Sequence, residues 1–262
     1  MPTPKRVAVT GALGRMGCCV RDALAEEPAL VLTAALEAPG HPRLGEVIAN
    51  NVVLSDDPVR ALAGCDVFID FSLPAATLAC LRTASARGVR AVIGTTGFSS
   101  AEHEEIRKLA QHTAVVLSPN FSVSVHVMLQ LARAASARLG SEFDVEILEL
   151  HHAAKRDAPS GTALRLAEAI AQARGTTLAE HLVLSREGTR GLRPAQAIGI
   201  QALRGGDNPG EHTVLWLGKG ERLELTHRAA TRDHFARGAV RAAVWLRDRA
   251  PGLYDMEDVL GV

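Results

Sequence analysis

Between residue 5 and about residue 118, short apolar runs alternate with segments in which apolar residues recur at helical spacing. The runs expected to be strands are 6–10, 30–36, 67–70, 91–94 and 114–117. Strands that alternate with helices are typical of a parallel sheet whose strands are joined by crossover helices. This part of the chain is therefore predicted to form an α/β domain.

The residues that begin and end the predicted helices agree with this periodicity. Pro74 stands where one helix begins and Gly88 where it ends, as expected from the preference for proline in the first turn and glycine after the last. Ser99 and Glu102 have the spacing of a capping box at the start of the next helix.

After about residue 122 the pattern changes. A helix to residue 138, a strand over 143–151 and a helix over 160–173 are followed by three strand-like runs with no helix between them, at 197–203, 211–217 and 222–227. Strands joined by short turns favour a mostly antiparallel sheet, and hence a second domain of α+β type. A last helix over 232–249 is expected to pack on the first domain. The predicted domains are 1–121 with 232–262, and 122–231.

The composition narrows the choice of partners and location. Lys and Arg number 29, as do Asp and Glu, so no positive field attracts nucleic acid. No signal-peptide pattern follows the first charges and no apolar run reaches the roughly 18 residues of a membrane span, so a cytoplasmic protein without a membrane partner is expected. The four cysteines lack C-x-x-C spacing and are expected to be small buried apolar residues in a reducing compartment.

A glycine-rich turn follows the first predicted strand. Gly11, Gly14 and Gly17 let the chain turn tightly and bring backbone N–H groups against a pyrophosphate at the start of a helix. Glu37 ends the second strand, where a carboxylate would accept hydrogen bonds from an adenosine ribose. A turn needed only for packing is the alternative, but the order of strand, turn, helix and acid favours a dinucleotide site.

Two further loops follow strands, at 94–98 and 118–122. Ligands of open parallel sheets lie beyond the carboxyl ends of the strands, so both loops are placed to contact a cofactor at the glycine turn. Each taken alone could be an ordinary turn.

The segment from Glu149 to Thr162 contains the side chains best suited to chemistry. His151 has a near-neutral pKa in its ordinary state and can exchange a proton, and Lys155 can hold a carboxylate or donate a proton. The helix predicted after Pro159 offers N–H groups and the Thr162 hydroxyl to another carboxylate. Together these groups suit a small dianionic substrate.

Two other interpretations of this segment stay open at this point. A metal site is disfavoured because His151 and His152 are neighbours on a strand and point to opposite faces, and no cysteine or carboxylate cluster completes a ligand set. No metal is therefore expected. A buried ion cluster without catalytic function would contain the same residue types.

The segment E-L-H-H-A-A-K-R-D-A-P-S-G-T at 149–162 resembles the hallmark of bacterial dihydrodipicolinate reductase, also named 4-hydroxy-tetrahydrodipicolinate reductase. The resemblance extends to the glycine turn and to the motifs at 67–72, 94–97, 120–122, 185–188 and 210–212, and so covers nearly the whole chain. It implies a Rossmann-type dinucleotide-binding domain, a substrate-binding domain whose open sheet builds a homotetramer, and closure of one domain onto the other.

The resemblance also implies the reaction and the residues that perform it. The reaction is reduction of dihydrodipicolinate to tetrahydrodipicolinate in the diaminopimelate route to lysine, with hydride from NADH or NADPH. His151 would act as general acid or base and Lys155 as proton donor, while His152, Gly161 and Thr162 would hold the substrate carboxylates. The implied cofactor contacts are Gly11, Ala12, Leu13, Gly14, Arg15, Met16, Gly17, Glu37, Gly94, Thr95, Thr96, Ser118, Pro119, Asn120 and Phe121.

One position departs from the family pattern. Many members have a basic residue directly after the ribose-binding acid, where it meets the 2′-phosphate of NADPH, whereas this chain has Ala38. Arg15 is then the one evident partner for that phosphate, and Glu37 favours a free 2′-hydroxyl. NADH is therefore expected to be at least as good a cofactor as NADPH.

Two other functions fit the dinucleotide domain equally well. One is a related two-domain dehydrogenase that acts on another small carbonyl or imine acid, and the other is a non-catalytic nucleotide-sensing homologue. The 149–162 segment argues against the first, and the presence of His151 and Lys155 argues against the second.

Overall fold

The computed structural model describes residues 3–49, 51–188 and 191–261. It divides into two compact units, one formed by Met1–Val123 with Arg232–Val262 and the other by Ser124–Thr231, which are called unit 1 and unit 2 below. Each unit has its own hydrophobic core.

Unit 1 contains an eight-stranded sheet in the order β13-β7-β6-β5-β1-β2-β4-β3. Its strands are β1 (Lys5–Thr10), β2 (Leu30–Leu36), β3 (Val47–Ala49), β4 (Val52–Ser55), β5 (Val67–Asp70), β6 (Arg90–Ile93), β7 (Ala114–Leu117) and β13 (Gly252–Tyr254). Except for the antiparallel pair β3–β4, the strands pair in parallel. Because β1 lies between β2 and β5, the strand order reverses there, which is where open α/β sheets bind ligands.

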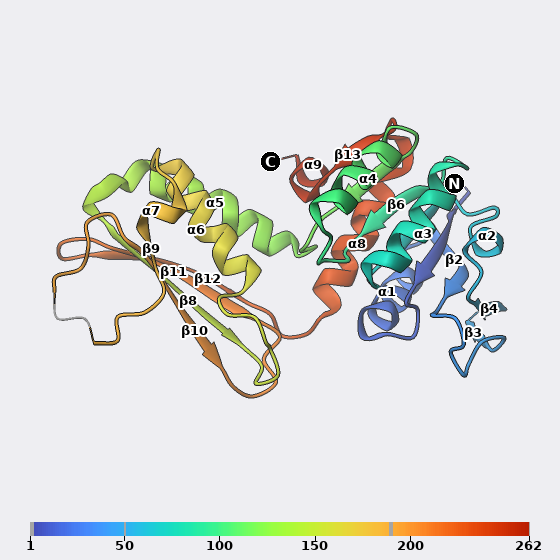
Figure 1. The fold of residues 1–262 in the computed structure, drawn as a ribbon, viewed down its shortest axis with the longest axis horizontal. Coiled ribbons are helices and arrows are strands. Elements are labelled where there is room, and N and C mark those ends of the chain that lie inside the picture. The colour runs from blue at the N-terminus through green and yellow to red at the C-terminus, as the bar shows by residue number, and fades with distance from the viewer. Residues whose placement is uncertain (1–2, 50, 189–190, 262) are drawn as a thin grey trace. The chain divides into compact units, whose positions relative to one another are not determined.

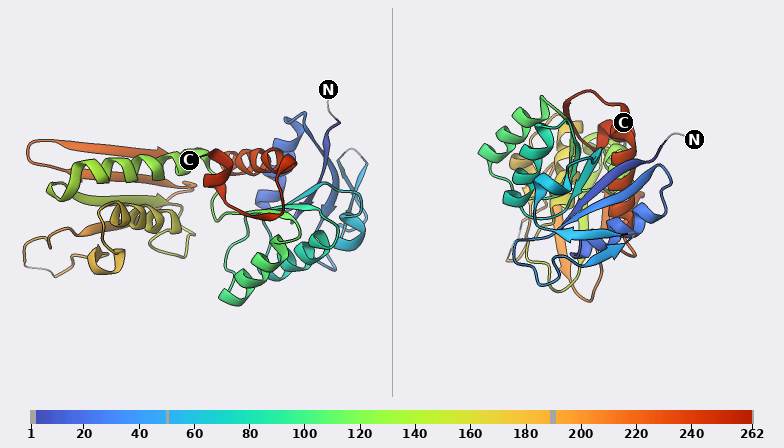
Figure 2. Two further views of the ribbon diagram at one scale, coloured as in Figure 1. Left: turned by 90° about the horizontal axis from the view of Figure 1, so that it is seen from above. Right: turned by 90° about the vertical axis from the view of Figure 1, so that its right-hand side faces the viewer.

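Helices cover both faces of this sheet. The helical segments of unit 1 are α1 (Arg15–Ala25), α2 (Pro58–Ala61), α3 (Pro74–Ser85), α4 (Ser100–Ala110), α8 (Asp233–Trp245), a short 3₁₀ turn (Leu246–Asp248) and α9 (Met256–Leu260). Helices α1 and α8 pack with Val7 and Val9 on one face, and α3 and α4 pack with Ala8 and Phe68 on the other (Figure 2). Ser99 and Glu102 form the expected capping box of α4.

Unit 2 contains a five-stranded sheet in the order β12-β11-β8-β10-β9. Its elements are α5 (Val123–Leu139), a 3₁₀ turn (Gly140–Glu142), β8 (Asp144–His151), α6 (Gly161–Ala173), α7 (Leu178–His181), β9 (Leu182–Val183), β10 (Ile198–Arg204), β11 (Glu211–Leu217) and β12 (Arg222–Arg228). Helices α5 and α6 lie on one face of the sheet (Figure 1), where they bury Val145, Ile147 and Trp216.

These two sheets confirm the expected fold class, a Rossmann-type parallel sheet with a second α+β domain. In unit 2, β11 pairs antiparallel with both β12 and β8 over seven residues each. The remaining pairs, β8–β10 and β10–β9, are parallel. Strand β8 therefore lies between β10 and β11, which follow one another in the sequence.

The surroundings of the cysteines differ from the expectation for two of the four. Cys65 and Cys80 are buried, but Cys18 and Cys19, which are neighbours on α1, are only half-buried. All four are free thiols. Among the helices of the described residues, none combines the length and the apolar character that a membrane crossing needs.

Candidate active site

The glycine turn between β1 and α1 is shaped by close contacts of its own backbone. Gly11 has a φ of +62°, which favours glycine, and a Cβ at Gly17 would lie 2.0 Å from the carbonyl oxygen of Gly11. A Cβ at Gly14 would lie 3.2 Å from the same oxygen. Glycine at 11 and 17 allows the start of α1 to come this close to the end of β1, so the turn fits a bound pyrophosphate.

A cleft of about 530 Å³ opens beside this turn and is lined by Gly11, Gly14, Glu37, Ala38 and Asp56 among others. Glu37 Oε1 accepts a hydrogen bond of 2.7 Å from the backbone N–H of Leu13, so its carboxylate is held against the turn. Leu73 and Ala76 add apolar surface. An acid beside an apolar cleft fits an adenosine, with the ribose at Glu37 and the base on the apolar wall.

The loops after β5 and β6 are joined through the buried carboxylate of Asp70. Its Oδ1 accepts hydrogen bonds from the backbone N–H and hydroxyl of Ser72, at 2.8 Å each, and from the Thr95 hydroxyl, at 2.7 Å. Phe71 packs where a Cβ of Gly94 would be. Gly94, Thr95 and Thr96 therefore lie at the carboxyl end of β6, beside the loop after β5 that lines the cleft.

The loop after β7 is held by its own short hydrogen bonds. The Ser118 hydroxyl donates to the carbonyl oxygen of Asn120 at 2.7 Å, and the Phe121 ring packs edge-on against Phe71. Pro119 is exposed. The predicted cofactor residues thus lie at the carboxyl ends of β1, β2, β6 and β7, although only Gly11, Gly14 and Glu37 of them line the cleft itself.

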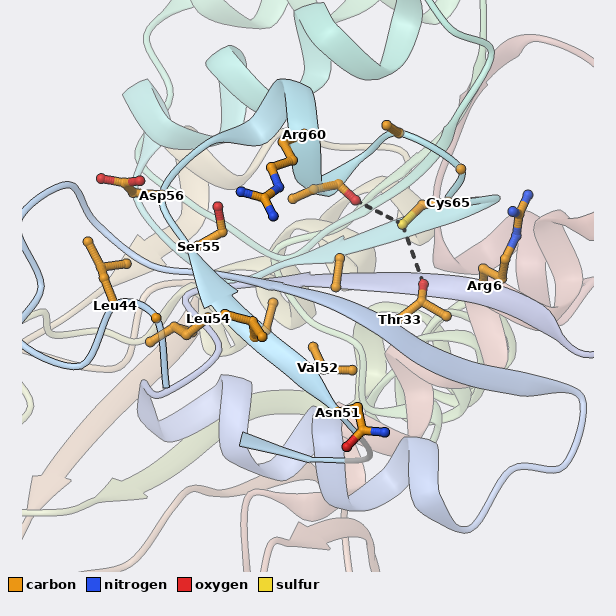
Figure 3. Close-up of a pocket in the computed structure, with 17 residues that line it drawn as sticks. Arg6, Thr33, Leu44, Asn51, Val52, Leu54, Ser55, Asp56, Arg60 and Cys65 are labelled. Atoms are coloured by element: carbon orange, nitrogen blue, oxygen red, sulfur yellow. Dashed lines mark hydrogen bonds between the residues drawn. The ribbon is translucent and has the colours of Figure 1, made fainter. Parts of the chain in front are cut away.

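A second cavity of about 580 Å³ lies between β2, β4 and α2 (Figure 3). Its walls include Arg6, Thr33 and Cys65, and the Cys65 thiol lies 3.5 Å from the Thr33 hydroxyl. Arg6 pairs with Asp66. Because no residue of the glycine turn lines this cavity, it does not fit the dinucleotide.

In unit 2, a buried carboxylate organises the end of β8. Glu149 Oε2 lies 2.6 Å from Nδ1 of His151, and Glu149 Oε1 accepts a 2.9 Å hydrogen bond from the backbone N–H of Ser160. Arg204, on the neighbouring strand β10, donates one hydrogen bond of 2.8 Å to each oxygen. The Glu149 side chain is fully buried, so this cluster is a desolvated ion pair with a histidine attached.

These contacts determine the charges in the cluster. Burial acts to raise the pKa of Glu149, but hydrogen bonds from Arg204, His151 and Ser160 outweigh it and hold that pKa below its ordinary value. Burial lowers the pKa of His151; Glu149 opposes this effect, whereas Lys155 and Arg204 add to it. The resting site therefore contains an ionised Glu149 and a neutral His151 near pH 7.

A second histidine, His212, packs against His151. The His212 ring stands edge-on to the His151 ring with centroids 5.2 Å apart, and its Nε2 lies 3.0 Å from the Ser160 hydroxyl. Burial lowers the pKa of His212 to about 3, so its ring is neutral. Gly210 has a φ of +152°, and a Cβ there would lie 2.8 Å from Nε2 of His151. Glycine at this position therefore keeps that nitrogen clear.

Lys155 and His152 lie in the loop after β8. The Lys155 ammonium contacts both carboxylate oxygens of Asp157, at 2.9 and 2.8 Å, and its hydrogen bond lowers the pKa of Asp157. His152 is half-buried, and its backbone N–H donates to the carbonyl oxygen of Asn208. Both side chains thus follow His151 on a loop tied to the turn between β10 and β11.

Helix α6 begins at Gly161, directly after this loop. The Ser160 hydroxyl caps the helix by accepting a 3.2 Å hydrogen bond from the backbone N–H of Ala163. Gly161 is exposed and Thr162 is half-buried, so the positive end of a 13-residue helix lies beside the cluster. An anionic group fits there.

Three important residues were not predicted from the sequence. No role was predicted for Arg204, or for Glu149 beyond its place in the motif. The two residues lie 55 positions apart and meet because β10 pairs with β8. Asp56 had no signal at all, because it reaches the cleft through the β4–α2 turn. Among the described residues, no group of three His, Cys, Asp or Glu side chains is placed to hold a metal.

A parallel sheet with a dinucleotide-sized cleft, together with a second unit that contains an acid–base cluster, defines the class of two-domain nicotinamide-dependent oxidoreductases. Within that class, two family models match this chain: dihydrodipicolinate reductase, N-terminus, over residues 5–121, and dihydrodipicolinate reductase, C-terminus, over residues 124–260. The chain belongs to the dihydrodipicolinate reductase family.

Individual proteins that this chain is similar to support the same family. The chain is 49% identical to 4-hydroxy-tetrahydrodipicolinate reductase of Nitrosomonas europaea, with 99% of each chain covered, and 48% identical to that of Anaeromyxobacter dehalogenans strain 2CP-C, with 98% of each covered. A solved dipicolinate-bound dihydrodipicolinate reductase from Paenisporosarcina sp. TG-14 is 27% identical, with a TM-score of 0.77 over 96% of this chain and 97% of that one. An amine dehydrogenase from Mycobacterium smegmatis, 13% identical with a TM-score of 0.59, shares the fold.

Proposed function

We propose that this chain reduces 4-hydroxy-tetrahydrodipicolinate, with loss of its hydroxyl as water, or the dehydrated form dihydrodipicolinate directly, to tetrahydrodipicolinate in the diaminopimelate route to lysine. The observation that carries the proposal is the Glu149–His151–Arg204 cluster beside the start of α6, in a chain of the dihydrodipicolinate reductase family. A reduced nicotinamide bound at unit 1 supplies the hydride. Domain 122–231 binds the substrate and domain 1–121 with 232–262 the dinucleotide.

The residues of unit 2 have separate tasks in this proposal. The start of α6, with Gly161 and Thr162, holds one substrate carboxylate, and His152 holds the other. Lys155 leaves Asp157 to donate a proton to the reduced ring, and His151 acts as general acid or base. The negative charge that develops on a conjugated imine during reduction needs such a donor at close range.

A coupled assay tests the reaction. The substrate is made freshly from pyruvate and aspartate semialdehyde, and the loss of NADH absorbance is followed. Lys155→Ala should lower kcat at least about 100-fold because it removes the proton donor. Lys219→Ala, at an exposed turn of the same unit, is the matched control and should retain activity. A wild-type chain that binds NADH without turnover would instead indicate a nucleotide-sensing homologue.

The dinucleotide cleft favours NADH. Glu37 and Asp56 place two carboxylates at the cleft where a 2′-phosphate would enter, and Ala38 provides no positive charge. Because like charges repel, kcat/KM for NADH should at least equal that for NADPH. The homologous family is NAD(P)H-dependent, and the choice between the two cofactors is part of this proposal.

Ala38→Arg tests this selectivity. A guanidinium at this position would give the 2′-phosphate a charge-assisted hydrogen bond and should raise kcat/KM for NADPH about tenfold. The value for NADH in the same variant is the internal control and should change little. A strong preference of the wild-type chain for NADPH would contradict the proposal.

The proposed assembly is a homotetramer in the cytoplasm. Its support is the face of the five-stranded sheet opposite α5 and α6, which exposes Leu148 and Leu203 on neighbouring strands. Exposed leucines on an open sheet are typical of a surface that binds another subunit.

A further inference from the structure

The carboxylate of Glu149 has every acceptor position filled. Each oxygen accepts one hydrogen bond from Arg204, and in addition Oε1 accepts from the backbone N–H of Ser160 and Oε2 contacts His151. A carboxylate offers about four lone-pair directions, so four contacts leave no place for a proton. Glu149 therefore cannot be the group that exchanges a proton with substrate.

The same contacts determine which nitrogen of His151 carries hydrogen. Arg204 and the Ser160 backbone can only donate, so Glu149 stays an acceptor, and Nδ1 of His151 must donate to it across 2.6 Å. In the neutral ring the hydrogen is then on Nδ1, and Nε2 carries the lone pair. Hydrogen bonding by one ring nitrogen sets the role of the other.

The surroundings of Nε2 suit a nitrogen that meets a ligand. Among the described residues, Nε2 of His151 has no hydrogen-bond partner. Gly210 leaves open the position that a Cβ would occupy 2.8 Å away, and the edge-on ring of His212 restricts rotation of the imidazole. The His151 imidazole is thus held by a hydrogen bond at Nδ1, while Nε2 is accessible to a ligand.

We propose that Glu149, neutralised by Arg204, is a positioning residue that holds His151 as the Nδ1–H tautomer, so that Nε2 is the nitrogen that exchanges a proton with the substrate. The proposal rests on the proposed reductase function only for the identity of that substrate. The charged or titratable groups that face His151 are Glu149 on β8, Lys155 in the following loop, Arg204 on β10 and His212 on β11.

The tautomer can be measured without substrate. In protein containing ¹⁵N-histidine, with the His151 signal assigned by its loss in His151→Asn, the neutral ring should show a protonated Nδ1 and an unprotonated Nε2. The opposite tautomer in the wild-type protein would overturn the proposal. Because this measurement needs no turnover, a failed reductase assay with the expected tautomer would defeat only the proposed function.

Glu149→Gln tests the positioning itself. The amide must point its NH₂ group at some neighbour, and of the neighbours only the imidazole can change from donor to acceptor. The variant should therefore shift His151 toward the Nε2–H tautomer and lower kcat/KM at least about 100-fold, as expected when a catalytic histidine is held in the wrong tautomer. The limb of the kcat/KM–pH profile that reports His151 should shift as well.

Glu146→Gln is the matched control. Glu146 lies on the same strand, is also mostly buried and also pairs with arginines, Arg186 and Arg193, but faces the opposite side of the sheet. Its substitution removes a comparable ion pair and should leave the His151 tautomer unchanged. If Glu146→Gln changes the tautomer as much as Glu149→Gln does, or if Glu149→Gln changes neither the tautomer nor the pH profile, the positioning role is wrong.

Discussion

His212 shows how burial of one side chain makes stability depend on pH. Its ring is neutral in the folded protein because burial lowers its pKa to about 3, whereas an unfolded chain would have the ordinary value of about 6.5. Between these two values the unfolded state binds the extra proton. The stability that neutral His212 contributes is therefore complete above about pH 6.5 and is lost as the pH falls toward 3.

Urea unfolding at different pH values tests this effect. In the wild type, His212 should lower the unfolding free energy by up to about 1.4 kcal/mol for each pH unit below 6.5. In His212→Gln, the loss of stability between pH 6.5 and pH 5.0 should accordingly be smaller by up to about 2 kcal/mol. Equal losses in the two proteins would show that another group is responsible.

At the same scale, residue types and spacing single out His151 and Lys155 as candidates, and the family resemblance adds Gly161, but neither identifies the groups that surround them. The partner of Glu149 is Arg204, which a local pattern cannot connect because 55 residues separate them. Asp56 is one acid among many until the β4–α2 turn brings it to the cleft. The roles of the predicted site residues stay predictions, whereas their neighbours are now known.

At the scale of elements, the strands that the sequence predicts correctly are those with a clear apolar run between periodic helical segments. Strands β1, β2, β5, β6 and β7 are found within a residue of their predicted bounds, because they are apolar runs between recognisable helices. Strands β3, β4 and β13 were not predicted. They have three or four residues, which is too short for a periodic pattern to be recognised in the sequence, and β3 and β13 are edge strands with no fully buried residue.

The pairing of strands was harder to predict than the strands themselves. Three consecutive strand-like runs correctly indicated antiparallel pairing for β11 and β12. The position of β8 between β10 and β11 depends on burial of the two sheet faces over more than 50 residues of chain, and no local pattern contains it. That pairing creates the site, because it brings Arg204 and His212 to either side of β8.

At the scale of the whole molecule, the exposed face of the five-stranded sheet determines the proposed assembly. Leu148 should be central to it, so Leu148→Glu should convert the tetramer to smaller species by placing a charge in an apolar interface. Light scattering after size exclusion measures the mass. Leu253→Glu is the control, because Leu253 of unit 1 is equally exposed, at 39%, but lies on another sheet. A wild-type monomer at micromolar concentration would contradict the proposal.

The two faces of strand β8 lie in different surroundings. Its odd-numbered positions, Val145, Ile147, Glu149 and His151, are buried against the helices or form the acid–base cluster, and its even-numbered positions lie on the open face. Loss of one residue near the middle of the strand would reverse this parity beyond that point, so that Leu150 would take the place of Glu149 and His151 would turn to the open face. Length changes within β8 are therefore tolerable only in pairs, so the buried cluster and the open face of the sheet must evolve together along these eight positions.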